Sequence, residues 1–421
     1  MNSLASSQAH RRKFNLILVI SLAFLDFLGF ALTIPLLPLL LLDTSFALVP
    51  IDTLTTTRYI LLGALLACYP LGQIAGAPLL GAISDHLSRK RVLLLSYLGN
   101  ILGYSLCLLS IMSAQIGFFF LGNFLAGIMG VNVATTNTII SDLSKKHERT
   151  RRFSLAAMAL GSAFIIGPFV TGFLLKAYPR GDLTPFGLIL GSASGLSLIN
   201  FVIFKRFYTV VDNQKALHTL KLSILRAEIW SVLKSKNGLK LAFTSTFLLY
   251  FGWYYFIKFF QVFLINILEI DERSFCWFLS YFGLCCLVAQ VLFYTYFSKH
   301  ITKSRVLKSF TLALAIAIFS FLFIKSHLHV YIAIALFSIA YSFICPCLTS
   351  FVSTYGDDHS QGKIMGLYQA AQSIAKVLSP VLAGLTMCLS PQFPIWISFL
   401  FIGATSAIFH YVFRGKRKSL D

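Results

Sequence analysis

The sequence predicts an all-α membrane protein in which twelve transmembrane helices form two six-helix pseudo-repeats with both termini in the cytoplasm. Three observations support this fold class. The 421 residues are 57% hydrophobic and only 12% charged, whereas soluble domains carry about 25% charged residues. Apolar runs long enough to cross the roughly 30 Å hydrocarbon core as a helix recur along the whole chain. Two short stretches of the first half also recur in the second half.

The apolar runs are continuous rather than alternating, which favours helices over the strands of a membrane barrel. The first run contains Asp26 and is too long for the core of a cleaved signal peptide, so we expect a retained first span. The expected spans are residues 14–42, 58–83, 92–113, 116–140, 153–177, 184–204, 239–268, 273–297, 306–324, 329–355, 363–389 and 393–413.

Lysine and arginine predict the orientation of these spans. If the N-terminus is cytoplasmic, 28 of the 35 basic residues lie in cytoplasmic segments and five lie in outward turns. Positive charge accumulates in this way on the cytoplasmic side of membrane proteins. The formal net charge of +20 is therefore explained by topology, and we expect no nucleic-acid partner.

Internal repeats divide the chain into two halves. SDHLSRKRVL at 84–93 matches SKHITKSRVL at 298–307 at five of ten positions, and GPFVTG at 167–172 resembles SPVLAG at 379–384. The two pairs are separated by nearly the same number of residues. We therefore expect two six-helix bundles joined by a cytoplasmic linker, and repeats of this kind are typical of transporters. The expected bounds are 1–204 for the first bundle, 205–238 for the linker and 239–421 for the second bundle.

These features resemble the major facilitator superfamily. The loop pattern of that family is matched by Gly81, Asp85, Arg89 and Lys90, with Ser88 where the family has a second glycine. Its antiporter pattern in the fifth span is partly matched by the helix-packing residues Gly167, Pro168 and Gly172. The first span, LDFLGFALTIPLLPLL at 25–40, is similar to that of the tetracycline-resistance-type proton antiporters. The resemblance implies proton-coupled export of a drug or small metabolite from a bacterial inner membrane.

The loop residues Gly81, Asp85, Arg89 and Lys90 form the expected cytoplasmic gate, a role that the resemblance implies. Basic residues alone would hold the turn in the cytoplasm, and a plain topogenic turn is the alternative interpretation. Topology gives no reason for Asp85, which can pair with a basic residue or cap a neighbouring helix. We therefore favour a latch between helices that separate during transport.

Two charged residues lie near mid-depth in the expected spans, Asp26 in the first and Lys376 in the eleventh. Ionisable groups at such depth are expensive and usually belong to ion or substrate pathways. We expect Asp26 to bind and release a proton during transport, the alternative being a structural hydrogen bond to a neighbouring helix. Lys376 is expected to meet Asp26 or an anionic group of the substrate.

The expected substrate cavity contains Asn123, Trp253, Tyr254 and Lys258. The aromatic residues around Lys258 could hold a flat ligand while the ammonium group meets an anion. They could equally form an interfacial belt with a lysine that extends to the membrane surface. Asn123 stands where the resembled family has an arginine in the fourth span. Coupling would then use Lys376 or another group, or the chain would only facilitate diffusion.

The sequence shows no pattern of catalytic residues, no phosphate-binding loop and no metal-ligand spacing. We therefore expect neither enzymatic activity nor a cofactor. We also expect a monomer, because one chain with two bundles is enough for a transporter. The expected partners are the lipid bilayer, a small-molecule substrate and protons. The alternatives are an uptake symporter or facilitator for a nutrient or organic anion, and a receptor that transports nothing.

Overall fold

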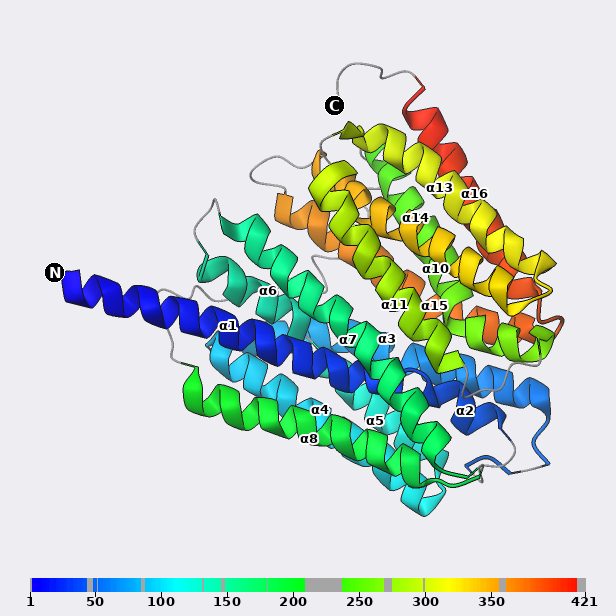
Figure 1. The fold of residues 1–421 in the computed structure, drawn as a ribbon, viewed down its shortest axis with the longest axis horizontal. Helices are drawn as coiled ribbons and strands as arrows, with labels where there is room; N and C mark the ends of the chain where they lie inside the picture. The colour runs from blue at the N-terminus through cyan, green and yellow to red at the C-terminus, as the bar shows by residue number, and fades with distance from the viewer. Residues whose placement is uncertain are drawn as a thin grey trace. The chain divides into compact units, whose positions relative to one another are not determined.

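The computed structural model describes residues 2–43, 48–50, 52–84, 88–130, 132–144, 148–179, 181–208, 237–268, 275–297, 300–355 and 361–414. These residues form helices joined by short connections (Figure 1). Eleven of the described helices are long and apolar enough to cross a membrane. The all-helical, multi-pass architecture predicted from the apolar runs is therefore confirmed, while the count of twelve spans and the cytoplasmic location of the termini stay predictions.

The chain divides into two compact units. The first unit comprises Met1–Asp52 and Cys68–Leu220, and the second comprises Thr53–Ala67 and Lys221–Asp421. One helix, α3 (Thr55–Ser84), contributes its first part to the second unit and the rest to the first. The proposed linker 205–238 lies mostly outside the described residues.

The first unit contains six further described helices and one short helix. Their bounds are α1 (Asn2–Thr33), α2 (Leu36–Leu42), α4 (Arg89–Ser113), α5 (Ile116–Ile128), α6 (Asn132–Asp142), α7 (Arg149–Ala177) and α8 (Thr184–Phe207). The second unit contains α10 (Asn237–Leu268), α11 (Phe275–Leu292), the π-helix η2 (Phe293–Phe297), α13 (Lys303–Phe319), the 3-10 helix η3 (Ser320–Phe323), α14 (His327–Ser353), α15 (Gln361–Met387) and α16 (Phe393–Val412).

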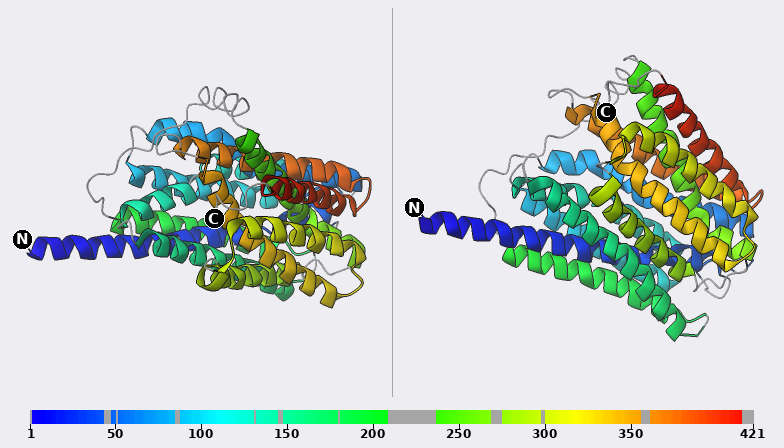
Figure 2. Two further views of the ribbon diagram at one scale, coloured as in Figure 1. Left: turned by 90° about the horizontal axis from the view of Figure 1, so that it is seen from above. Right: turned by 45° about the horizontal axis from the view of Figure 1, so that its top comes forward.

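The same helix neighbours occur in each unit. In the first unit α1 packs against α7 and α8, and α4 packs against α5 and α8. In the second unit α10 packs against α15 and α16, and α13 packs against α14 and α16. Figure 2 shows these neighbours from two further directions. In order along the chain the partners correspond, so the two units share one packing scheme.

The fourth expected span, 116–140, is two helices rather than one. Helix α5 ends at Ile128 and α6 begins at Asn132, and Gly130 donates its backbone N–H to the carbonyl of Gly127 in a short turn, 2.9 Å. Asn and Thr residues dilute α6, and glycine at the break lowers the helical propensity. Neither piece alone is long enough to span a bilayer.

Small residues let the backbones of α3, α4 and α5 approach closely. A Cβ built on Gly72 of α3 would lie 2.8 Å from the backbone nitrogen of Ile128 and would collide with the carbonyl oxygen of Phe124. A Cβ on Gly103 of α4 would lie 2.8 Å from the carbonyl oxygen of Gly122 on α5. Such small-residue contacts are the usual way in which membrane helices pack tightly.

Replacing Gly72 with alanine should lower the free energy of unfolding by about 1–3 kcal/mol, because the added methyl overpacks a contact with backbone atoms that cannot move aside cheaply. The matched control is Gly191→Ala on α8, where a Cβ would meet nothing within 4 Å. That variant should be neutral or more stable, since alanine is the better helix former by about 0.5–1 kcal/mol. Thermal unfolding of the two purified variants in one detergent measures the difference. Equal unfolding temperatures would contradict the close contact at Gly72.

Candidate functional site

Asp26 lies on α1 inside the first membrane-spanning helix and is half-buried. The side-chain Nδ2 of Asn100, on α4, donates a hydrogen bond to Oδ1 of Asp26 at 3.0 Å. Asn100 is itself buried. Hydrogen bonds to an ionised acceptor are stronger than neutral ones, so this bond fixes the carboxylate at a defined place within the first unit.

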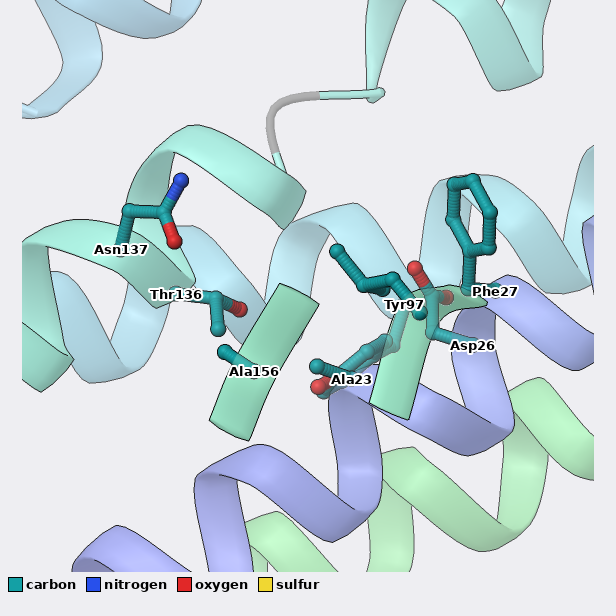
Figure 3. A pocket seen from close by; sticks show the side chains of 8 residues that line it. Ala23, Asp26, Phe27, Tyr97, Thr136, Asn137 and Ala156 are labelled. Carbon is teal, nitrogen blue, oxygen red and sulfur yellow. The ribbon is translucent and has the colours of Figure 1, made fainter. Parts of the chain in front are cut away.

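The carboxylate lines a small hollow of the first unit, which we call the Asp26 pocket. Figure 3 shows Asp26 and Tyr97 close together, with Thr136 and Asn137 projecting from α6. The lining residues come from α1, α4, α6 and α7 and are Ala23, Asp26, Phe27, Tyr97, Thr136, Asn137, Ala156 and Leu160. Carboxylate, hydroxyl and amide groups therefore converge in an otherwise apolar setting, which suits the binding of a proton or a polar group of a ligand.

Sequence reasoning found Asp26 but not Asn100 or Tyr97. Both lie in the third expected span, where one amide and one phenol within an apolar run carry no sign of the residue that they face. Electrostatic interactions also join Asp26 to Tyr69 of α3 and to Tyr97 and Tyr104 of α4. The signal that could have been used is the presence of Asn100 itself, because a lone amide within a span usually has a polar partner on another helix.

Two of the expected gate residues tie the start of α4 to the ends of other helices. Arg89 forms an ion pair with Asp142, the last residue of α6. Lys90 donates from Nζ to the backbone oxygens of Tyr208, 2.6 Å, and Lys205, 3.1 Å, at the C-terminal end of α8. A cation is favourable there because the last carbonyls of a helix carry partial negative charge.

The other two gate residues are less informative. Asp85 lies outside the described residues, so its proposed role as a latch stays a prediction. Gly81 lies within α3, which continues to Ser84. Asp142 was missed as the acidic partner, although an acid at the end of the fourth expected span was visible in the sequence.

The fifth-span motif lies where α7 meets α1. A Cβ on Gly167 would lie 2.6 Å from Cβ of Ala31, and the hydroxyl of Thr171 donates to the carbonyl of Leu32 at 2.8 Å. Pro168 lies inside α7, and Gly172 is buried. Gly167 therefore permits a close approach of the helix that carries Asp26.

The lysines of the expected cavity lie in the second unit. Nζ of Lys376, on α15, is 5.7 Å from the ring centroid of Tyr254 on α10. Lys258 of α10 interacts electrostatically with Lys376. Trp253 is buried and stacks on Tyr341 of α14, with 3.7 Å between ring centroids and 10° between ring planes. The structure thus brings together Tyr254, Lys258 and Lys376, whereas a pairing of Lys376 with Asp26 stays a prediction.

Asn123 lies on α5, and its amide nitrogen contacts groups on α5 itself and on the neighbouring helix α4. Nδ2 donates to the carbonyl of Phe119 on the same helix at 3.0 Å, and lies 3.6 Å from Sγ of Cys107 on α4. These contacts suit the packing of α5 against α4. The predicted role of Asn123 in a substrate cavity remains untested.

Comparison with known proteins identifies a family. Residues 19–380 match the model of the Major Facilitator Superfamily. The chain is 32% identical over 194 residues to the class H tetracycline resistance protein of Pasteurella multocida, a match covering 45% of this chain and 44% of that protein. It thus matches less than half the length of this relative.

Two other proteins are similar along most of their length. Multidrug resistance protein 2 of Bacillus subtilis is 22% identical over 391 residues, covering 92% of this chain and 91% of the relative. The crystal structure of a D-xylose–proton symporter superposes with a TM-score of 0.77 at 18% identity, covering 97% of this chain and 98% of that one. At this identity the superposition shows a common fold.

Asp142→Asn should destabilise the protein by about 1–3 kcal/mol. The variant removes the negative partner of a guanidinium that is only 10% exposed, and breaking a buried pair costs about 3–5 kcal/mol. We reduce this figure because the Asp142 side chain is 35% exposed and partly screened. The measurement is thermal unfolding of the purified protein in detergent.

The control for this prediction is Glu148→Gln, which breaks the ion pair between Glu148 and Arg152 one turn apart, whose side chains are 38% and 20% exposed. Pairs four residues apart on a helix contribute about 0.3–0.5 kcal/mol. If Asp142→Asn loses no more stability than Glu148→Gln, the ion pair of Arg89 and Asp142 contributes no more to stability than that of Arg152 and Glu148.

Proposed function

The chain belongs to the major facilitator superfamily of secondary transporters, and we propose that it exports an amphipathic drug or small metabolite in exchange for protons. One observation carries this proposal. The Asp26 carboxylate lies within a membrane-spanning helix, accepts a hydrogen bond from Asn100 and lines a pocket with Thr136 and Asn137. Acids in such positions usually belong to ion or substrate pathways.

Asp26 is suited to change its charge during the transport cycle. The ionised carboxylate is expensive in a medium of low dielectric constant, and binding a proton removes most of that cost. The amide of Asn100 meanwhile provides a hydrogen bond to the ionised form. We infer that Asp26 binds a proton from the outer side and releases it to the cytoplasm, while the substrate moves in the opposite direction.

The coupling in this proposal does not need the arginine of the resembled antiporters. Asn123 occupies that place, and an amide carries no charge at any physiological pH. Asp26 therefore carries the proton, and Thr136 and Asn137 provide hydrogen-bonding groups beside it. We assign Gly167 and Pro168 to the close packing of α7 against the helix that holds Asp26.

The direction of transport is inferred from the relatives. The similar proteins of Pasteurella multocida and Bacillus subtilis are named for resistance to tetracycline and to multiple drugs, and a transporter confers resistance to a drug by exporting it. Because the tetracycline match covers only 44% of that protein, the substrate class is part of the proposal.

The membrane topology is also part of the proposal. We infer twelve spans, with α5 and α6 together forming the fourth, and both termini in the cytoplasm of a bacterial cell. The distribution of basic residues supports this orientation. Arg89 and Lys90 then lie at the cytoplasmic ends of α4, α6 and α8. A monomer is sufficient for this function.

The proposal is tested by reconstitution of the purified protein in liposomes that contain a pH-sensitive dye. Candidate drugs, metal chelates and organic anions are added in turn to wild type, Asp26→Asn and Asp26→Glu. We expect substrate-driven proton movement in wild type, loss to the background of protein-free liposomes in Asp26→Asn, and partial activity in Asp26→Glu. The amide removes the titratable proton while it keeps the size and polarity of the side chain.

The matched control is Asp182→Asn. Asp182 is an acid in the connection before α8, where its carboxylate accepts the backbone N–H of Thr184 at 2.8 Å. This variant should transport protons as wild type does. Substrate transport without proton movement, unchanged in Asp26→Asn, would identify a facilitator or a carrier coupled to another ion. Substrate and protons moving in the same direction would identify an uptake symporter.

A further inference from the structure

Two helices of the second unit each carry three polar residues that are spaced four positions apart. A spacing of four places side chains one above the other on a single helix face. We call the six residues concerned the tyrosine–lysine seam. They are Tyr250, Tyr254 and Lys258 of α10 and Tyr368, Gln372 and Lys376 of α15.

The two helix faces of the seam lie against each other in a regular register. The hydroxyls of Tyr250 and Tyr368 are 3.1 Å apart and share a hydrogen bond. Two turns further along both helices, the like charges of Lys258 and Lys376 repel each other. Each pair joins residues 118 positions apart, so α10 and α15 run in the same direction here. The seam therefore has a hydroxyl end and an ammonium end.

Neighbouring side chains fix the orientation of the seam. The ring of Tyr254 stacks on that of Tyr250, with centroids 6.1 Å apart and planes at 21°, and lies beneath Nζ of Lys376. On α14, the hydroxyl of Thr349 is 2.9 Å from that of Tyr368. The far side of α10 packs into aromatic residues, where the rings of Phe256 and Phe337 meet edge to face at 5.6 Å. The seam is thus a polar face of α10 and α15 that adjoins a cluster of aromatic rings.

The ammonium end of the seam has an excess of positive charge. Lys258 lies ten residues before the end of α10, about 15 Å along the helix, and Lys376 lies near the middle of α15. The described residues of the second unit contain no aspartate or glutamate. The acids that the sequence of this unit does contain lie outside the expected spans. Neither lysine therefore has a carboxylate partner among the described residues of its unit.

Two ammonium groups at membrane depth repel each other and are poorly solvated, so an anion between them removes both penalties. Both lysines and Tyr254 are only half-buried, and they remain accessible to a ligand. A phenol ring next to the lysine pair offers a flat face for stacking. Charge and shape together select the ligand class.

We propose that the tyrosine–lysine seam binds the transported substrate as an organic anion, its acidic group held between Lys258 and Lys376 and its aromatic or apolar body lying along Tyr254. The hydroxyl pair of Tyr250 and Tyr368 lies eight residues from the lysine pair on each helix, about 12 Å along the helix. Both tyrosines are buried and bonded to each other, so this pair holds α10 and α15 in register and marks the closed end of the site. This inference rests on the proposed transport function and names its substrate class.

The test measures binding rather than transport. Full-length protein is placed in lipid nanodiscs made only of phosphatidylcholine, so that no anionic lipid competes. Equilibrium dialysis then measures the affinities of three radiolabelled probes of one shape, 2-naphthoate, neutral 2-naphthamide and cationic 2-naphthylmethylammonium. We expect the naphthoate to bind about tenfold or more tightly than the amide, since hydrogen bonds to charged groups are the stronger kind.

Variants of the two lysines assign that preference to the seam. Lys376→Gln and Lys258→Gln should each weaken naphthoate binding about tenfold and leave amide binding unchanged, whereas Lys376→Arg should keep the preference for the anion. Lys325→Gln is the control, because Lys325 is an exposed lysine of the second unit that lies outside the seam. An unchanged elution profile in size-exclusion chromatography verifies that each variant is folded.

The result also separates this inference from the proposed function. Asp182→Asn should bind naphthoate as wild type does, because Asp182 lies in the other unit and outside both proposed sites. Failure of proton coupling with anion binding intact would reject the proposed exchange and keep the seam. Equal affinity for naphthoate and naphthamide, a preference for the cation, no binding of any probe, or naphthoate binding unaffected by both lysine variants would overturn the inference.

Discussion

The desolvation of charged groups is the constraint on which the rest of this structure depends. A carboxylate or an ammonium group inside a bilayer is stable only if protein groups or a ligand replace the water that it loses. In the first unit Asn100 performs part of that task for Asp26 through one hydrogen bond. Any movement that separates α1 from α4 breaks this bond, so the charge of Asp26 and the packing of the unit are physically linked.

The second unit meets the same constraint with the opposite charge. Its helices pack with the same neighbours as those of the first unit, yet its membrane-spanning helices carry Lys258 and Lys376 and, among the described residues, no acid. One packing scheme thus holds charges of opposite sign in the two units. A proton site in one unit and an anion site in the other would allow the charge of the protein to change in one place while the substrate is held in another.

Two kinds of contact join the helices of the first unit. Charged side chains connect helix ends, and small residues allow close packing within the spans. Arg89 and Lys90 connect the start of α4 to the ends of α6 and α8. Within the spans, glycines such as Gly72 and Gly167 remove the side chains that would separate the backbones. Contacts of the first kind depend on opposite charges, whereas those of the second kind depend on the absence of a side chain.

The sequence by itself determined the all-helical, multi-pass architecture, most of the helices and the family resemblance. This was possible because a helix needs about twenty apolar residues to cross the bilayer, so length and composition reveal each span. Asp26 and Lys376 were recognisable as candidate site residues for the same reason, since charge within such a run is rare. The separation of α5 from α6 was not predicted, because the apolar residues continue almost without interruption through the glycine turn at 127–130.

Only the tertiary structure decided which residues meet. The partner of Asp26 is 74 positions away in the sequence, Arg89 meets Asp142 on another helix, and Lys376 meets Tyr254 across two helices. The pattern of apolar residues shows which face of a helix is buried, but each face has several possible neighbours. The choice among them depends on the simultaneous packing of all the helices in a unit, which no local stretch of sequence contains.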